Sequence, residues 1–233
     1  GIASAGAGGG AANCSLNKCT ISENAADQGN GGGVINCALV GCAVVANSSY
    51  LNGAGTYGGS LLNCTVVRNT SGGYSAGTSA VAGGTLTNCI VLGNFARQAS
   101  VSTTNYGGST LTFCNAAPLP VGLGNTNVDP QFLSDEIHLA ETSPCRAIGT
   151  GITPGTDLDG QPWVNPPAMG CDEWLPGPVL ATEPGFQVRP GERTLHWNVV
   201  AAGQSPFTYA WFKDGSAVQD DSHFAAAGTA NLK

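Results

Sequence analysis

A repeated pattern of apolar residues recurs five times between residues 16 and 116 and constrains the fold more than any other feature. Each copy places a Leu three residues before a Cys, with a small or β-branched apolar residue two positions after that Cys. The copies follow one another at intervals of 22 to 25 residues, a period typical of stacked coils rather than of one globular core. The repeated triplets are Leu16/Cys19/Ile21, Leu39/Cys42/Val44, Leu61/Cys64/Val66, Leu86/Cys89/Val91 and Leu111/Cys114/Ala116.

Two stacked architectures use a period in the low twenties, the leucine-rich horseshoe and the right-handed parallel β-helix. A horseshoe repeat needs several leucines per coil and often a helical return segment. Here each copy has one consistent Leu among Gly, Asn, Ser, Thr, Val and Cys. Apolar residues at two-residue steps, interrupted by turn residues, indicate short strands. We therefore predict an all-β fold in which residues 1–127 form about five coils of a right-handed parallel β-helix.

Two columns of side chains are expected to run along this solenoid. Equivalent residues of stacked coils lie about 4.8 Å apart, so a column of asparagines can pass side-chain amide hydrogen bonds from coil to coil. We interpret both columns as structural ladders. They consist of Asn24, Asn47, Asn69 and Asn94, and of Cys19, Cys42, Cys64, Cys89 and Cys114.

The nine cysteines also raise the question of a metal or redox site. A zinc site needs four ligands that converge on one point, whereas a ladder spreads its sulfurs along an axis, and the three histidines lie outside the repeats. Because free Cys is among the most buried residue types, we expect most of the ladder to consist of buried thiols, although neighbouring coils lie close enough for some pairs to oxidise. No cofactor is expected.

The charge distribution argues against several partners and against catalysis. Only 10% of residues are charged, and up to Ala116 three basic residues accompany two acidic ones, Glu23 and Asp27. Such a surface offers nucleic acid no basic groove and an anionic membrane no patch, so we expect neither nucleic-acid binding nor direct membrane insertion. Polysaccharide lyases and glycosidases need converging carboxylates. The two acids have no copies in later coils, so we expect no enzyme activity and no catalytic residues.

The repeat ends after Cys114, where two alanines and two prolines replace the expected strand and its Asn. Proline cannot donate to a strand ladder, so we predict that the coils stop and that residues 128–175 cap the exposed end of the solenoid. This segment is rich in loops, and a disulfide between Cys145 and Cys171 would stabilise it. Its Asp157 and Asp159 could bind Ca²⁺, but further ligands and a closing Glu are missing, so an Asp-rich turn is the stronger interpretation.

The chain changes character after a Pro- and Gly-rich linker at residues 176–180. The stretches 193–197 and 207–215 read as alternating strands, the second ending in a turn. The run Tyr-Ala-Trp-Phe-Lys-Asp-Gly at 209–215 resembles strand C of an immunoglobulin-like domain, with Trp211 as its buried core residue. We predict a partial immunoglobulin-like β-sandwich over 181–233, because such a domain needs about 100 residues. We also expect the chain to be a fragment of a longer protein, since it begins without Met or a signal peptide.

The segment after the coils contains the runs Val-Asp-Pro-Gln-Phe-Leu at 128–133 and Met-Gly-Cys-Asp-Glu at 169–173. Following Asn- and Cys-rich coils, these runs resemble the end of β-helix domains in large bacterial surface proteins of the choice-of-anchor Q type. The coils themselves are similar to polymorphic outer-membrane protein repeats. The resemblance covers about residues 1–175. It implies an exported protein at the cell surface or outside the cell, and it implies no catalytic residues.

Two classes of function follow from these observations. The first is an extracellular structural or adhesive module whose partner is a glycan or protein surface, with self-association into a filament as a variant. The second is a fragment of a polysaccharide-active β-helix enzyme, a lyase or glycosidase, whose active-site coils lie upstream. For the first class, the candidate glycan contacts are aromatic residues in the variable turns, where sugars could stack, although each could instead pack against a neighbouring coil. They are Tyr50, Tyr57, Tyr74 and Tyr106.

Overall fold

The computed structural model describes residues 2–3, 9–72, 79–97, 105–151, 153–188, 191, 194–202 and 207–233. Within these residues every regular element is a β-strand, so the described chain is all-β, as predicted. The chain divides into two compact units, each described by itself below. The coil unit comprises Gly1–Leu158 with Pro162–Trp174, and the C-terminal unit comprises Asp159–Gln161 with Leu175–Lys233.

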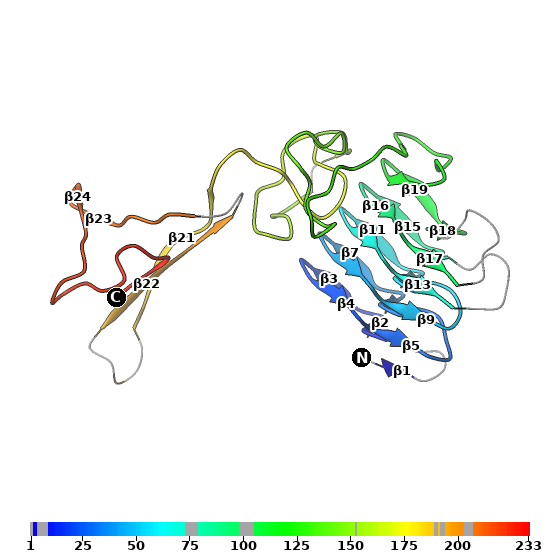
Figure 1. Ribbon diagram of the computed structural model, residues 1–233, viewed down its shortest axis with the longest axis horizontal. Helices are drawn as coiled ribbons and strands as arrows, with labels where there is room; N and C mark the ends of the chain where they lie inside the picture. The colour runs from blue at the N-terminus through cyan, green and yellow to red at the C-terminus, as the bar shows by residue number, and fades with distance from the viewer. Residues whose placement is uncertain are drawn as a thin grey trace. The chain divides into compact units, whose positions relative to one another are not determined.

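The coil unit contains four parallel sheets of five strands each, and consecutive strands along the chain belong to consecutive sheets. Figure 1 shows the strands stacked from the blue N-terminal coil to the green one. Sheet A consists of β1 (Ile2–Ala3), β5 (Ala25–Ala26), β9 (Ser48–Ser49), β13 (Thr70–Ser71) and β17 (Phe95–Ala96). Sheet B consists of β2 (Ala11–Ala12), β6 (Val34–Ile35), β10 (Thr56–Tyr57), β14 (Val81–Ala82) and β18 (Tyr106–Gly107).

The other two sheets contain the repeated apolar residues. Sheet C consists of β3 (Ser15–Asn17), β7 (Ala38–Val40), β11 (Ser60–Leu62), β15 (Thr85–Thr87) and β19 (Thr110–Thr112). Sheet D consists of β4 (Thr20–Ser22), β8 (Ala43–Val45), β12 (Thr65–Val67), β16 (Ile90–Leu92) and β20 (Asn115–Ala116).

The register of the sheets follows the sequence repeat. The five repeated leucines pair with one another in sheet C, and the residues two positions after each Cys pair in sheet D. Side chains alternate across a strand, so these residues face one continuous core, where Leu39, Leu86 and Leu111 are at most 2% exposed. The predicted parallel β-solenoid is confirmed.

In each coil a single residue with positive φ makes the corner between sheets C and D. The left-handed region is open to Gly at no steric cost and is tolerated by Asn. Gly41 turns the chain between sheets C and D at a φ of 58°, and Asn63 and Asn88 occupy the same corner at 47° and 53°. Because one residue completes the corner, the Cys that follows it points into the core in every coil.

A short loop at residues 117–127 covers the C-terminal end of the coils. Ala116 N donates to the carbonyl of Thr126 at 3.0 Å. The side chain of Asn125 accepts a hydrogen bond from Cys114 N at 2.8 Å. The loop therefore supplies partners for the last coil, whose strand edges would otherwise be left unpaired.

The following residues, 128–158 and 162–174, form what we call the flank segment. It packs along the outer face of sheet D rather than over the end of the coils, so the predicted cap of residues 128–175 is not confirmed. Leu139 and Met169 pack with Ile90 of sheet D, and Cys171 packs with Val67. The strands β8 and β12 are buried on both faces, and a sheet with two apolar faces needs such a cover.

The C-terminal unit contains two small antiparallel sheets. In the first, β22 (Leu195–Ala202) pairs with β21 (Val179–Val188) and with β25 (Asn231–Leu232). The pairing of β21 is irregular around Pro184, which has no N–H to donate. In the second sheet, β23 (Phe212–Lys213) and β24 (Ser216–Ala217) form a hairpin.

These sheets do not confirm the predicted immunoglobulin-like sandwich. Residues 207–211 form no strand, although the sequence predicts one over 207–215. Trp211 is half-buried rather than central to a core, and its Nε1 donates to the carbonyl of Thr229 at 2.8 Å. The hairpin turn is as predicted, because Asp214 and Gly215 both adopt the positive φ that a two-residue turn of this kind requires.

Candidate functional site

The asparagine ladder is the polar centre of the coils. Each side-chain amide donates to Oδ1 of the Asn in the next coil at 3.0 Å, from Asn24 through Asn47 and Asn69 to Asn94. The same oxygens accept backbone N–H groups. Asn105 extends the ladder by accepting from Asn94 Nδ2, and the repeat does not reveal it because it follows after only 11 residues. Since the amides serve one another, the ladder is structural, as interpreted from the sequence.

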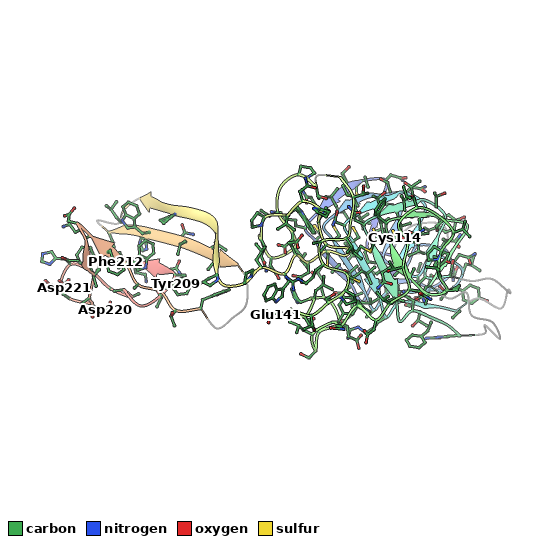
Figure 2. The ribbon with its side chains drawn as sticks, turned by 90° about the horizontal axis from the view of Figure 1, so that it is seen from above. Cys114, Glu141, Tyr209, Phe212, Asp220 and Asp221 are labelled. Carbon is green, nitrogen blue, oxygen red and sulfur yellow. The ribbon has the colours of Figure 1, made fainter. Side chains whose placement is uncertain are left out.

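The cysteine ladder lies in the same interior, and Figure 2 places Cys114 among the side chains enclosed by the coil strands. Cys42, Cys64, Cys89 and Cys114 are fully buried, and all nine cysteines are free. The hydrogen bond with Cys64, together with burial, raises the pKa of Cys42 well above its ordinary value. Burial likewise raises the pKa of Cys89. These two thiols, which stay protonated, are poor nucleophiles and poor metal ligands. Against the effect of burial, hydrogen bonds with neighbouring thiols lower the pKa of Cys64 and of Cys114.

The predicted disulfide between Cys145 and Cys171 is wrong, because both residues are free thiols that contact different coils. Cys145 Sγ accepts a hydrogen bond from Asn115 Nδ2 at 3.2 Å, and Cys171 N donates to Thr65 Oγ1 at 3.0 Å. Thr65 and Asn115 lie two coils apart in sheet D, which is roughly 10 Å and beyond the reach of a disulfide. The flank segment takes its core from sheet D, so it does not depend on a covalent link.

The four tyrosines predicted to contact glycans differ in their surroundings. Tyr50 is 46% exposed. Tyr57 is half-buried in sheet B. Tyr106 is also half-buried, and its hydroxyl donates to the carbonyl of Pro118 at 2.9 Å, which engages it with the end loop. Tyr74 lies outside the described residues. Tyr50 is therefore the best placed of the described tyrosines to stack on a ligand.

Tyr50 lies in a groove of about 300 Å³ on the outer face of sheet A, which we call the sheet A groove. Its walls come from two rows that run along the stack, formed by the first residue of each strand and by the residue two positions later. The first row contains Ala25, Ser48, Thr70 and Phe95, which pair in register. The second row contains Asp27, Tyr50, Gly72 and Arg97. The groove is lined by Asp27, Ser48, Ser49, Tyr50, Thr70, Gly72 and Arg97.

Hydrogen bonds between coils hold the second row in register. Gly72 N donates to Ser49 O at 2.7 Å, and Arg97 N donates to Ser71 O at 2.9 Å. Successive members of the row therefore keep the coil spacing of about 4.8 Å. Gly72 stands between Tyr50 and Arg97 in this row without adding a side chain, and all three residues line the groove.

The groove contains side chains that can bind a sugar but only one carboxyl group among its described lining residues. The Tyr50 ring can stack, the hydroxyls of Ser48 and Thr70 can donate or accept, and Arg97 and Asp27 add one charge of each sign. Asp27 is the one carboxyl among the described lining residues. Glycosidases use a pair of carboxyl groups about 5 to 10 Å apart, and this lining does not contain such a pair.

A second groove, of about 420 Å³, lies around Tyr57 on sheet B. Its other lining residues are glycines and small neutral side chains, and it contains no charged group among the described residues. It offers an aromatic ring but fewer polar contacts than the sheet A groove. For that reason we regard it as the secondary candidate.

The two aspartates predicted as a weak calcium site have different environments. Asp157 is fully buried, and its Oδ2 accepts a hydrogen bond from Glu173 N at 2.8 Å. Asp159 is exposed. The contact of Asp157 with the backbone agrees with the Asp-rich turn favoured from the sequence, and calcium binding stays a prediction.

Ser48, Thr70 and Arg97 were not among the residues predicted from the sequence, yet the repeat contains a signal for them. They stand one or three positions after a ladder asparagine, and the residue two positions after Asn47 and Asn69, Ser49 or Ser71, is buried. Because the ladder fixes the register of sheet A, positions one and three after each Asn define its outer face. Reading the sequence in this frame places Ser48, Tyr50 and Thr70 on one surface.

No protein-family model, curated protein or solved structure matches the chain. Among the residues that the structure describes, there is no helix with the length and apolar character to cross a bilayer. The fold therefore defines the class of protein by itself: a repeat protein built on a parallel β-solenoid. The resemblance to choice-of-anchor Q proteins stays an interpretation based on sequence motifs.

Proposed function

We propose that this chain is a non-catalytic structural and adhesive module that binds a glycan in the sheet A groove. The observation that carries the proposal is the exposed Tyr50 side chain in a groove that Gly72 and Arg97 also line. Sugar rings present flat C–H faces that stack on aromatic side chains. Their hydroxyl and carboxylate groups accept hydrogen bonds from side chains such as those of Ser48, Thr70 and Arg97.

The charges around the groove favour an acidic glycan. Arg97 is the one cationic residue among the described lining, and its guanidinium can bind a carboxylate through two parallel hydrogen bonds. The net charge of −7 belongs mainly to the second half of the chain, whereas residues 1–116 contain three basic and two acidic residues. An acidic sugar over Gly72 would therefore meet no large repulsive field from the coils.

The cellular setting that we infer is the cell surface or the extracellular space. The motifs shared with choice-of-anchor Q proteins support export, and a solenoid suits a rigid spacer because its length grows by adding coils. Self-association into a filament and contact with a protein surface belong to the same proposal. A polysaccharide-active enzyme fragment is the alternative, and it would require active-site coils beyond these residues.

The proposal is tested by screening the purified chain against neutral and acidic glycans, with and without Ca²⁺, for both binding and product release. We expect binding of acidic glycans without cleavage. Tyr50→Ala and Arg97→Gln should each weaken binding about tenfold, the size expected for a lost ring contact or ion pair. The control is Phe212→Ala, which removes an exposed aromatic ring in the C-terminal unit.

Each other outcome of the screen has a definite meaning. Release of unsaturated or reducing-end products would overturn the non-catalytic proposal and show an active site within this chain, whereas the enzyme alternative places its active-site coils upstream. Equal loss of binding in Phe212→Ala would show that the ring contact is not specific to the groove. No binding to any glycan would overturn the glycan proposal and leave a spacer or a protein-binding role.

A further inference from the structure

Cys14 and Cys37 form an isolated pair of thiols on neighbouring coils. Their Sγ atoms lie 3.5 Å apart. The residues that follow them, Ser15 and Ala38, pair in sheet C, and Ala38 N donates to the carbonyl of Cys14 at 2.9 Å. The coil spacing of about 4.8 Å lies within the range of Cα separations found in disulfides. The backbone therefore holds the two Cα atoms at a separation that a disulfide can span.

The coils that follow the pair place no cysteine at the same position. The next coils place Gly59 and Gly84 at the equivalent position, as the pairing of Ser60 with Ala38 and of Ser60 with Thr85 shows. Neither coil thus places a third thiol in line with Cys14 and Cys37. In the inner cysteine ladder, by contrast, a thiol such as Cys64 has a neighbour on each side.

The two thiols also differ in access to solvent. Cys14 is exposed, whereas Cys37 is 1% exposed and packs in the core of the coils. A small oxidant can therefore reach Cys14 first, and the protein itself then presents Cys37 as the resolving thiol. This order suits thiol–disulfide exchange, in which a mixed disulfide forms at the accessible sulfur.

We propose that Cys14 and Cys37 form a disulfide that links the first two coils when a small-molecule disulfide is the oxidant. The Cys14 thiolate attacks one sulfur of the small disulfide, forms a mixed disulfide and releases one small thiolate. The Cys37 thiolate then attacks the Cys14 sulfur and displaces the second small thiolate. Two protein thiols are oxidised and one small disulfide is reduced to two thiols, which take up the two protons. The inference rests on the geometry of the pair and does not depend on the proposed glycan binding.

The test uses the full chain with all its cysteines. The native protein is incubated with oxidised glutathione, the remaining thiols are blocked with N-ethylmaleimide, and the digest is mapped by mass spectrometry. We expect the nine free thiols to fall to seven, with one peptide pair linked through Cys14 and Cys37. The same link should form in Cys19→Ser, a half-buried control from the inner ladder, and should be absent in Cys14→Ser.

Three results would overturn the proposal. Cys14 could remain a stable mixed disulfide with glutathione while Cys37 is alkylated only after unfolding. Cys14 could instead pair with Cys19. The third result is nine free thiols after prolonged incubation at an oxidising ratio of glutathione. Because Cys14 is exposed, Cys14→Ser is expected to fold normally, which a matching thermal transition of the reduced proteins would verify.

Discussion

The coils and the flank segment satisfy their buried polar groups in opposite ways. In the coils, each Asn of the ladder finds its partner one turn away, in a residue of the same type. In the flank segment, carboxylates hold the backbone: Asp172 accepts from Leu139 N at 2.7 Å and Glu173 from Ala168 N at 3.0 Å. A repeat supplies its own partners, whereas an irregular segment needs partners placed individually.

Asparagine itself illustrates this difference, because it serves both regions. The ladder asparagines point inward, while Asn63 and Asn88 stand at an outer corner and reach the flank segment. Asn63 Nδ2 donates to Ala168 O at 2.7 Å, and Asn88 Oδ1 accepts from Thr150 N at 2.8 Å. The same residue type therefore stacks coils when it faces inward and attaches an irregular segment when it faces outward.

The largest effect is expected from Asn69→Ala, in the middle of the ladder. The Asn69 amide donates to Val44 O, Val67 O and Asn94 Oδ1, so its loss leaves several buried groups unpaired. We expect about 3 to 5 kcal/mol of destabilisation, measured by urea unfolding. Asn24→Ala, at the less buried end of the ladder, is the control and should cost clearly less. Equal costs would contradict the idea that each rung depends on both neighbours.

Leu139→Ala tests the flank segment instead of the coils. Leu139 is 1% exposed and packs in the cluster formed with sheet D. Truncating a buried Leu costs about 2 to 4 kcal/mol. Limited proteolysis should show cleavage within 128–174 before cleavage within the coils. Simultaneous cleavage of both regions would mean that the two form one cooperative unit.

Asn88→Gly separates the corner asparagine from the turn that it makes. Glycine accepts the positive φ at this position, so the variant removes only the side-chain bonds to Thr150 and Asn63. We expect a loss of about 1 to 3 kcal/mol in unfolding free energy. The converse change Gly93→Asn, at an open corner with positive φ, should have almost no effect. An unchanged unfolding free energy in Asn88→Gly would show that the Asn88 side chain does not hold the flank segment.

The smallest effect is expected from Glu173→Gln and depends on pH. Burial raises the pKa of Glu173 above the ordinary value of 4.5, so ionisation of this group is harder in the folded chain. Stability linked to Glu173 should fall as pH rises from 4.5 towards the raised pKa. Because a single group titrates, we expect this effect to be smaller than those of the three preceding variants. Urea midpoints across this range should fall less steeply in Glu173→Gln than in the unmodified chain. Equal slopes in the two proteins would show that Glu173 does not cause the pH dependence.

The coils could be predicted from the sequence because their contacts are periodic. Leu39, Cys42 and Asn47 have equivalents in other coils, so the register of one coil gives that of the next. The position of the flank segment could not be predicted in the same way, because Cys171 and Thr65 meet across 106 residues without a repeat to relate them. The disulfide prediction failed for this reason, since it assumed that the segment had little core of its own.

The candidate groove could be predicted from the sequence only in part. Tyr50 was predicted as a glycan contact from its residue type and its place in a turn. Arg97 and Thr70 were not predicted, because composition alone gives no reason to place them beside Tyr50. The stacking of sheet A brings these residues together, and the ladder asparagines fix that stacking.

The most direct test of the account is calorimetric titration of the acidic glycan that binds most tightly in the screen. The comparison is between the unmodified chain, Tyr50→Ala and the control Phe212→Ala. The account predicts one binding site per chain, a loss of about tenfold or more in affinity for Tyr50→Ala, and unchanged affinity for the control. Unchanged affinity in Tyr50→Ala, with the fold intact, would contradict the sheet A groove as the binding site.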